Sequence, residues 1–576
     1  MKRFALAGML AAVTALALIV GAIATGDAEG QKLDTVSVQL LGLNDYHGNL
    51  EPPAGGGGRI GTVDAGGVEY FATHIANLKA ANPNTIVVGA GDMIGASPLL
   101  SALFHDEPSI ESLNAAGLQV SAVGNHEFDE GKDELLRMQN GGCHPTDKCQ
   151  DGTPFEGADF QYLSANVFLI PNAKEKAAAK KAKKVARSKP LLPAFTVKEV
   201  GGVKIGFIGM TLEGTPQIVT PSGVAGLRFY PEAYMANYYT QNLRKQGVRT
   251  IVVLIHEGGF QTGSDINGCV GMSGPIVAFT NLLSPDIDVV VSGHTHAAYN
   301  CVIGNKIVTS ASSFGRLITD IDLEIDRATG EVTSKKAINR IVTRTVPKHA
   351  TETALIARYS AIAAPLANKV IGKVSGDITR TANAAGESAL GDVIADAQLA
   401  ATKPANKGNA VIAFMNPGGI RADFTASQQS GGEQPGQVTY SEAFTVQPFS
   451  NTLVVKTLTG AQIKALLEQQ FGNPAAGQNR ILQVSAGFSY SYNLANAAGS
   501  RVDASSIKLN GTTVGPATSY RVTMNSFLAS GGDGFTVFNQ GTDQLGGEVD
   551  IDALVTYFGA NPTVAPGPQN RITRLP

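Results

Sequence analysis

The segment VSAVGNHEFD, residues 120–129, shows the pattern that organises the amino-terminal half of the chain. Its apolar start has the length of a β-strand, and Asn125, His126 and Asp129 follow directly. Four more apolar runs of strand length also end in polar side chains. They are VSVQLLGL (36–43) before Asn44, Asp45, Tyr46 and His47, TIVVGAG (85–91) before Asp92, TIVVLI (250–255) before His256, and DIDVVVSG (286–293) before His294, Thr295 and His296.

Stretches with helical periodicity lie between these runs, for example residues 68–81 and 109–116. The alternation of strand-like and helix-like segments predicts an α/β domain built in layers. In such domains ligands bind at the carboxyl ends of the strands. We therefore expect the polar residues to form a site along one edge of the sheet.

The length and composition argue against several classes of protein. The 576 residues are enough for three or four ordinary domains, or for two large α/β domains. Charged residues make up 16% and hydrophobic residues 43%, which argues against a disordered chain and a coiled coil. A net charge of −3 gives no bulk attraction to nucleic acid or to an anionic membrane. Any anionic ligand must be held by local groups, and a nucleic-acid polymer is not expected as a partner.

The amino terminus has the features of a signal peptide. Lys2 and Arg3 precede an apolar stretch from Phe4 to Val20, and small residues for cleavage follow at 22–24. We expect residues 1–24 to be removed, the protein to be secreted or periplasmic, and no stable membrane span to remain. An uncleaved anchor is the alternative, because the apolar stretch is nearly long enough to cross a bilayer.

Four cysteines fit an oxidising compartment and allow three pairings. We favour a bond between Cys143 and Cys149, which closes a short loop, and a second between Cys269 and Cys301. Free buried thiols are the alternative. A thiolate metal site has little support, because no Cys-x-x-Cys motif occurs.

The character of the sequence changes near residue 345, where we expect a domain boundary. Residues 34–345 would form the first domain, and 346–371 a connecting segment that is helical over 351–369 apart from Pro365. Residues 372–576 are interpreted as a mixed α/β domain with helices at 388–402 and 460–470. The basic run 172–189 is expected to be a solvated helical or disordered excursion, with a polyanion-binding patch as the alternative.

The histidines are unevenly distributed over the chain. Of nine, five directly follow the strand-like runs, and the other four (His74, His105, His144 and His349) are interpreted as structural. Neutral imidazole and carboxylate are ligands for zinc, manganese and iron, and Asp92 is well placed to bridge two ions. Two metals about 3.5–4 Å apart can polarise a phosphoryl oxygen and lower the pKa of a bridging water.

In order and spacing these segments resemble the calcineurin-like metallophosphoesterases. With the carboxy-terminal half included, the likeness is closer, to the secreted bacterial 5′-nucleotidase and UDP-sugar hydrolase family. The resemblance implies an α/β (α+β) protein, with a four-layer α/β/β/α metallophosphoesterase domain and a second, mixed α/β substrate-binding domain. It also implies two divalent metal ions, which would be zinc, manganese or iron.

The resemblance assigns a role to each residue of the amino-terminal pattern. Asp45, His47, Asp92 and His296 would hold one ion, and Asp92, Asn125, His256 and His294 the other. His126 would not be a ligand. It would contact the phosphoryl group and stabilise the transition state, oriented by Asp129.

In the second half, the loop 416–421 combines glycines with an arginine. Gly418 and Gly419 allow close approach of a ligand, and Arg421 can pair with an anionic group, although by itself the loop reads as a turn with a surface arginine. The resemblance implies that Phe449 and Phe527 sandwich a nucleobase. It further implies contacts to base and ribose from Asn416, Asn451, Asn525 and Asp533.

The sequence also departs from the family pattern. Asp392 and Ser450 stand where the family has Asn and Gly. Family members also have arginines shortly before that Asn, whereas here the nearest arginine before Asp392 is Arg380. These departures leave the metal site untouched but leave the preferred nucleotide open.

The leading interpretation is a secreted phosphoesterase that hydrolyses 5′-nucleotides to nucleosides and phosphate by in-line attack of a metal-bound hydroxide. Its partner would be a small-molecule nucleotide. Alternatives are hydrolysis of UDP-sugars or 2′,3′-cyclic nucleotides on the same scaffold, or an exported protein that binds without turnover. Every metal position and the His126–Asp129 pair are filled, which speaks against the last. The sequence indicates no oligomeric state.

Overall fold

A computed structural model describes residues 34–576 except 54, 184–187, 220–221 and 475. The expected signal peptide, residues 1–24, lies outside the described residues. Within them, no helix has both the length and the apolar character needed to cross a membrane.

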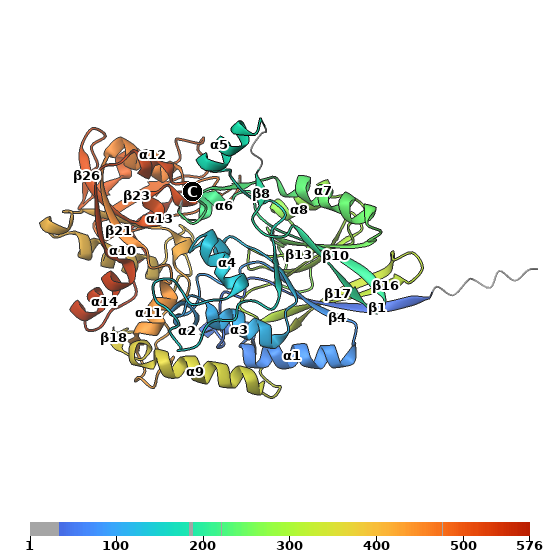
Figure 1. The fold of residues 1–576 in the computed structure, drawn as a ribbon. Helices are drawn as coiled ribbons and strands as arrows, with labels where there is room; N and C mark the ends of the chain where they lie inside the picture. The colour runs from blue at the N-terminus through green and yellow to red at the C-terminus, as the bar shows by residue number, and fades with distance from the viewer. Residues whose placement is uncertain (1–33, 54, 184–187, 220–221, 475) are drawn as a thin grey trace, which may run out of the picture.

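The amino-terminal domain contains two six-stranded sheets packed face to face (Figure 1). The first has the order β17-β16-β1-β4-β5-β6, and the second β14-β15-β13-β12-β10-β9. The strands of the first sheet are β17 (Val332–Ile341), β16 (Leu317–Asp326), β1 (Thr35–Leu43), β4 (Thr85–Ala90), β5 (Val120–Ala122) and β6 (Gln161–Leu163). Those of the second are β14 (Ala298–Ile303), β15 (Lys306–Ala311), β13 (Val289–Ser292), β12 (Thr250–His256), β10 (Val203–Thr211) and β9 (Phe195–Val200).

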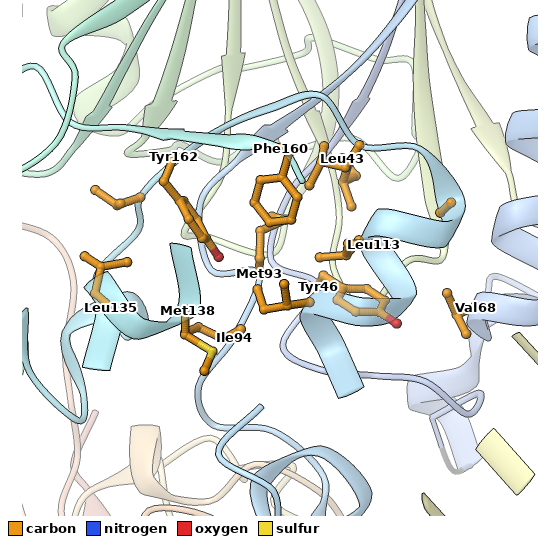
Figure 2. Packing of buried hydrophobic residues seen from close by; sticks show 14 of the residues in the cluster. Leu43, Tyr46, Val68, Met93, Ile94, Leu113, Leu135, Met138, Phe160 and Tyr162 are labelled. Atoms are coloured by element: carbon orange, nitrogen blue, oxygen red, sulfur yellow. The ribbon is translucent and has the colours of Figure 1, made fainter. Parts of the chain in front are cut away.

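Helices cover the outer face of each sheet and complete the expected four layers. On the first sheet lie α1 (Val68–Ala81), α3 (Glu107–Ala116) and α4 (Lys132–Asn140), whose apolar faces share one core. On the second lie α7 (Glu232–Lys245) and α8 (Pro275–Leu282). Figure 2 shows the first of these cores, where Tyr46, Met93 and Phe160 lie between the strands and the helices.

The expectation of a site along the edge of one sheet needs a correction. Strands β1, β4 and β5 belong to the first sheet, whereas β12 and β13 belong to the second. All five strands are buried, and β4 contacts β12 across the sandwich. The polar residues therefore meet where the carboxyl ends of two packed sheets converge, which the order of elements along the chain does not reveal.

Helix α9 (Ala350–Ala367) connects the two halves of the molecule and continues through Pro365. Leu355, Tyr359 and Ala363 bury its inner face in the core of the first sheet. The helix contacts α1 in the first domain and α11 (Tyr440–Val446) in the second, and it runs along one side of both (Figure 1).

The carboxy-terminal domain is built on a five-stranded sheet of order β22-β19-β26-β21-β27. Its strands are β22 (Gln483–Val484), β19 (Ile412–Met415), β26 (Ser519–Asn525), β21 (Thr452–Thr459) and β27 (Thr542–Val549). Helices α10 (Ala389–Thr402) and α14 (Asp550–Ala560) pack on each other, and α12 (Gly460–Glu468) packs on β21. The loops that follow β19 and β26 face the first domain across a cleft.

The cysteine pairing is confirmed, with disulfides between Cys143 and Cys149 and between Cys269 and Cys301. The basic run contains helix α5 (Ala173–Lys181), which buries no side chain. A capping box formed by Asn172 and Glu175 begins this helix.

The buried carboxyl group of Glu352, in the first turn of α9, should make the stability of the folded protein depend on pH. Its side chain is fully buried, and neither carboxyl oxygen has a hydrogen-bond partner among the described residues. Burial, with a smaller contribution from Glu69, raises the pKa of Glu352 to about 8. Because the folded-state pKa lies above the unfolded one, the folded state keeps a proton that the unfolded state loses, and stability falls as pH rises from about 4.5 to about 8.

We therefore expect Glu352→Gln to melt at a higher temperature than the wild type at pH 9, with little difference at pH 4. Each unit by which folding raises the pKa of Glu352 corresponds to roughly 1.4 kcal/mol of unfolding free energy lost at high pH. Thermal melts across this range, with the exposed Glu199→Gln as control, measure the effect. A wild type and Glu352→Gln with parallel pH profiles would contradict it.

Candidate active site

Six of the seven sequence-predicted metal ligands form two compact groups. Asp45, His47 and His296 make one, and Asp92, His256 and His294 the other, with the ligand atoms of each group within 4.8 Å of one another. The carboxylate of Asp92 lies between them, because its Oδ2 is 2.9 Å from His256 Nε2 and 3.6 Å from His47 Nε2. The Nε2 atoms of His47 and His296 are 3.2 Å apart.

The backbone at these positions is unusual for non-glycine residues. Five of the predicted ligands have φ in the left-handed region, at 50° for Asp45, 49° for His47, 54° for Asp92, 70° for His294 and 54° for His296. Such conformations cost roughly 1–3 kcal/mol each and persist where the surroundings fix them. Gly124 must be a glycine here, because a Cβ at this position would lie 2.2 Å from Asp92 Oδ1.

Hydrogen bonds behind the ligands orient them toward a shared centre. His47 donates from Nδ1 to Gly95 O over 2.7 Å, and His256 donates from Nδ1 to Ala90 O over 2.8 Å. In the neutral rings these bonds leave both Nε2 atoms as free electron-pair donors. Within the part of the chain that the structure describes, the buried Oδ1 of Asn125 has no hydrogen-bond partner. The donor set therefore fits divalent cations, and the orphaned amide oxygen of Asn125 is a further candidate donor.

The electrostatics of the group are those of a cation site. Burial opposes ionisation, but His296 and His256 lower the pKa of Asp45 to about 2. Burial and the neighbouring His256 lower the pKa of His294 to about 3. Burial likewise lowers the pKa of His256, yet Asp92 overcomes it and raises that pKa to about 10. A metal ion at His256 would replace the proton that offsets Asp92.

His126 lies beside this cluster and is bonded to Asp129. Its Nδ1 and Asp129 Oδ2 are 2.6 Å apart, and its backbone N–H donates to Asp92 Oδ1 over 2.9 Å. Burial lowers the pKa of His126, but Asp129 and Asp92 raise it above the ordinary value. With Nδ1 held by Asp129, Nε2 is the nitrogen left for a ligand in the cleft that His126 lines.

The sequence reasoning did not assign a role to Glu127. Its carboxylate accepts hydrogen bonds from the backbone N–H groups of Asp92, Met93 and Gly124. Glu127 therefore fixes the backbone that presents Asp92 and the loop that presents His126. The position of Glu127 within the segment GNHEFD (124–129) is visible in the sequence, but its contacts with Asp92 and Met93, which follow β4, are not.

A cleft of about 480 Å³ runs between the two domains, a size typical of small-molecule sites. One wall includes Asn125, His126, Asp129 and His294. All nine substrate residues expected from the sequence lie on its lining: Asn416, Gly418, Gly419, Arg421, Phe449, Asn451, Asn525, Phe527 and Asp533. The other five candidate ligands are not among the residues that line the cleft: Asp45, His47, Asp92, His256 and His296.

Two residues of the second domain interact with the first domain beside the candidate metal ligands. The ring of Phe449 stacks on that of His126, with centroids 5.7 Å apart. The Arg421 guanidinium lies 5.8 Å from the centre of the Phe449 ring. Burial and Arg380 lower the pKa of Arg421, and the carboxylates of Asp92, Asp129 and Asp45 oppose this. The electric field of Arg421 therefore acts across the domain boundary on the cluster.

The remaining cleft residues are linked to one another. Asn525 Nδ2 donates to Asn416 Oδ1 over 3.0 Å, and Asn525 Oδ1 caps α13 (Ser526–Ala529) by accepting from Leu528 N. Because both ends of its amide are used in this way, Asn525 supports Asn416. The ring of Phe527 lies against Gly532, where a Cβ would be 2.6 Å from it.

The departures from the family pattern have different structural consequences. Asp392 does not line the cleft. Its carboxylate lies 3.7 Å from the guanidinium of Arg571 and accepts a hydrogen bond from the backbone N–H of Gln569. Arg380 donates a hydrogen bond to the backbone carbonyl of Ile420, the residue before Arg421. Ser450 lines the cleft with φ of 50°, a conformation that favours glycine.

Two further cleft features were not foreseen. Arg480 lines the cleft and pairs with Asp533. His105, interpreted above as structural, lies at the rim between Glu130 and Asp147 and stacks on His144. The hydrogen bond that His105 donates to the Glu130 carboxylate is the largest cause that raises the pKa of His105 to about 9.

The fold and the ligand cluster define the class of protein, a calcineurin-like metal-dependent phosphoesterase. Residues 39–298 match the family model described as "Calcineurin-like phosphoesterase", and residues 370–540 match "5'-nucleotidase, C-terminal domain". The chain belongs to the 5′-nucleotidase family of these phosphoesterases.

Similar proteins agree with this membership. Cell wall protein Lmo0130 of Listeria monocytogenes is 32% identical over 563 residues, which cover 93% of this chain and 68% of that protein. Endonuclease YhcR of Bacillus subtilis is 31% identical over 91% of this chain, which spans only 39% of its length. The crystal structure of a 5′-nucleotidase precursor from Thermus thermophilus superposes with a TM-score of 0.72 at 26% identity, covering 94% of this chain and 99% of that one.

The close approach of Gly124 to Asp92 gives a test of the ligand cluster. Gly124→Ala would push a methyl group into the Asp92 carboxylate. We expect the purified variant to retain less manganese than the two equivalents expected of the wild type, measured by elemental analysis after gel filtration. Gly376→Ala is the matched control, because a Cβ there meets nothing within 4 Å. Equal metal content in both variants would contradict the placement of Asp92 as a ligand.

Proposed function

We propose that this protein is an exported phosphoesterase that releases phosphate from 5′-nucleotides. The observation that carries the proposal is the composition of a single cleft. One wall holds His126 and residues of the ligand cluster, and the other holds Arg421, two phenylalanines and a hydrogen-bonded set of polar side chains. A ligand that spans both walls needs an anionic end and an aromatic end, as a nucleotide has. The name of the Thermus thermophilus protein supports this reading.

The ligand cluster fits two divalent cations, with Asp45, His47, Asp92 and His296 for one and Asp92, Asn125, His256 and His294 for the other. When bound, such a pair supplies Lewis acidity and a nucleophilic hydroxide at neutral pH. Zinc, manganese and iron all suit this mixed donor set.

The protein's own groups would then act on the phosphoryl group. His126 would donate a hydrogen bond from Nε2 to a phosphoryl or leaving oxygen, while Asp129 holds the opposite side of the ring and stabilises its positive charge. Arg421 would pair with the phosphate from the second domain and offset charge on its oxygens. Because these donors are fixed before the substrate binds, little reorganisation is needed during the reaction.

The second wall would determine which leaving group is accepted. Phe449 and Phe527 offer aromatic faces for a base, and Asn416, Asn451 and Asp533 offer hydrogen-bonding groups, with Gly418 and Gly419 allowing close approach. Asn525 would act mainly through Asn416.

We also propose that residues 34–345 and 372–576 are the two domains and that 346–371 connects them. The contacts of α9 with both halves support this division. Export is supported by the apolar amino-terminal segment and by the two disulfides.

Metal removal and substitution of His126 test the proposed chemistry. We expect phosphate release from AMP to stop in a chelator and to return with manganese or zinc. We expect His126→Ala to lower kcat by roughly 10²–10⁴. The control is His74→Ala. His74 lies in α1, and its Nε2 is 3.1 Å from Thr343 O. Unchanged turnover in His126→Ala, or in metal-free protein, would refute the proposed roles.

Substitution of Phe527 tests whether this ring stacks on the base of the substrate. Phe449 is less suitable, because it also stacks on His126. Replacing Phe527 with Leu removes the aromatic face, and stacking contributes on the order of 1–3 kcal/mol per base, so KM for AMP should rise about tenfold or more. KM for ribose 5-phosphate, which has no base, should change little. A similar rise for both substrates would show that Phe527 supports the fold of the cleft and does not stack on a base.

A further inference from the structure

Asp533 is fixed from two sides by side chains that also line the cleft. Its Oδ1 accepts from Arg480 Nη1 over 2.6 Å, and its Oδ2 accepts from Asn416 Nδ2 over 3.0 Å. The backbone is fixed as well, because Asn473 Nδ2 donates to Asp533 O over 2.6 Å. Asp533 itself has φ of 55° between Gly532 and Gly534. Neither its backbone nor its carboxylate is free to turn.

The held carboxylate has unused acceptor capacity. An ionised carboxylate only accepts hydrogen bonds and has about four lone-pair sites on its two oxygens. Arg480 and Asn416 use one site on each oxygen, which leaves one further site on each. Two acceptor sites side by side match two hydroxyl donors on neighbouring carbons, which is the arrangement of the 2′- and 3′-hydroxyls of ribose.

Arg480 is itself part of the cleft surface. Its side chain is 24% exposed and that of Asp533 10%, so the pair lies at the cleft wall, where it is partly desolvated. An ion pair in this setting holds its geometry better than an exposed one and is screened less by solvent. Losing Arg480 would free Oδ1 and allow the carboxylate to rotate away from its bidentate orientation.

We propose that Arg480 is a positioning residue that makes the cleft prefer ribonucleosides to 2′-deoxyribonucleosides, by holding Asp533 in the orientation that accepts two neighbouring hydroxyls. The inference rests on the proposed function and specifies its substrate class. A deoxyribose would leave one partly buried acceptor of Asp533 without a partner, and such mismatches are a strong source of discrimination.

The test measures binding separately from turnover. Adenosine and 2′-deoxyadenosine are titrated calorimetrically into metal-loaded wild type, Arg480→Gln, Arg480→Lys and Asp533→Asn. Arg501→Gln serves as the control, because Arg501 packs over Phe471 in the same domain and does not line the cleft. Phosphate release from AMP and 2′-deoxy-AMP is assayed in parallel.

We expect the wild type and Arg501→Gln to bind adenosine about tenfold more tightly than 2′-deoxyadenosine, the factor that corresponds to one hydrogen bond. Arg480→Gln should lose most of this preference by weakening adenosine binding alone, and Arg480→Lys should restore part of it. Asp533→Asn removes the ion pair from the other side and should also abolish the preference, which keeps the test decisive if Arg480→Gln does not fold.

Equal losses for both nucleosides in Arg480→Gln would overturn the inference, since a merely structural arginine would act on both. So would a wild type without any preference, or one that binds neither nucleoside. A wild type that prefers adenosine but releases no phosphate from AMP would overturn the proposed function and still support the role of Arg480.

Discussion

The crowding of buried carboxylates and imidazoles around Asp92 is the constraint on which the rest of the structure depends. Asp45, Asp92 and the surrounding histidines form two groups whose possible ligand atoms lie within 4.8 Å of one another, and most of these residues have backbone conformations that cost free energy. Buried ionisable groups are costly unless something shares their charge. Divalent cations would do so, and the packed sheets, the Glu127 carboxylate and the backbone carbonyls behind His47 and His256 all serve to keep the donors in place.

The two domains divide the work of the cleft. In the proposed function, the first would provide the metal ligands and His126, and the second would provide a recognition wall of aromatic and amide groups. Phe449 and Arg421 join the two, because the ring stacks on His126 and the guanidinium influences Asp92. The Asp392 departure does not enter this division, because its carboxylate faces Arg571. Differences in substrate preference should therefore be sought on the recognition wall.

The grouping of the candidate ligands could be predicted because each lies at or shortly after the carboxyl end of a buried strand. Parallel strands deliver the residues after their carboxyl ends to one region, and helix α1 (Val68–Ala81) matches the expected range 68–81. The two sheets were expected only from the family resemblance. The apolar pattern itself could not show which strand belongs to which sheet, because buried strands of either sheet look alike. Arg480 was missed for another reason. It meets Asp533 from a loop 53 residues earlier, and no local pattern marks that contact.

Anomalous diffraction from crystals grown with manganese would locate the bound ions relative to Asp92. We expect two peaks, one among Asp45, His47 and His296 and the other among Asn125, His256 and His294, with the Asp92 carboxylate between them. A single peak, or peaks that avoid Asp92, would contradict this expectation.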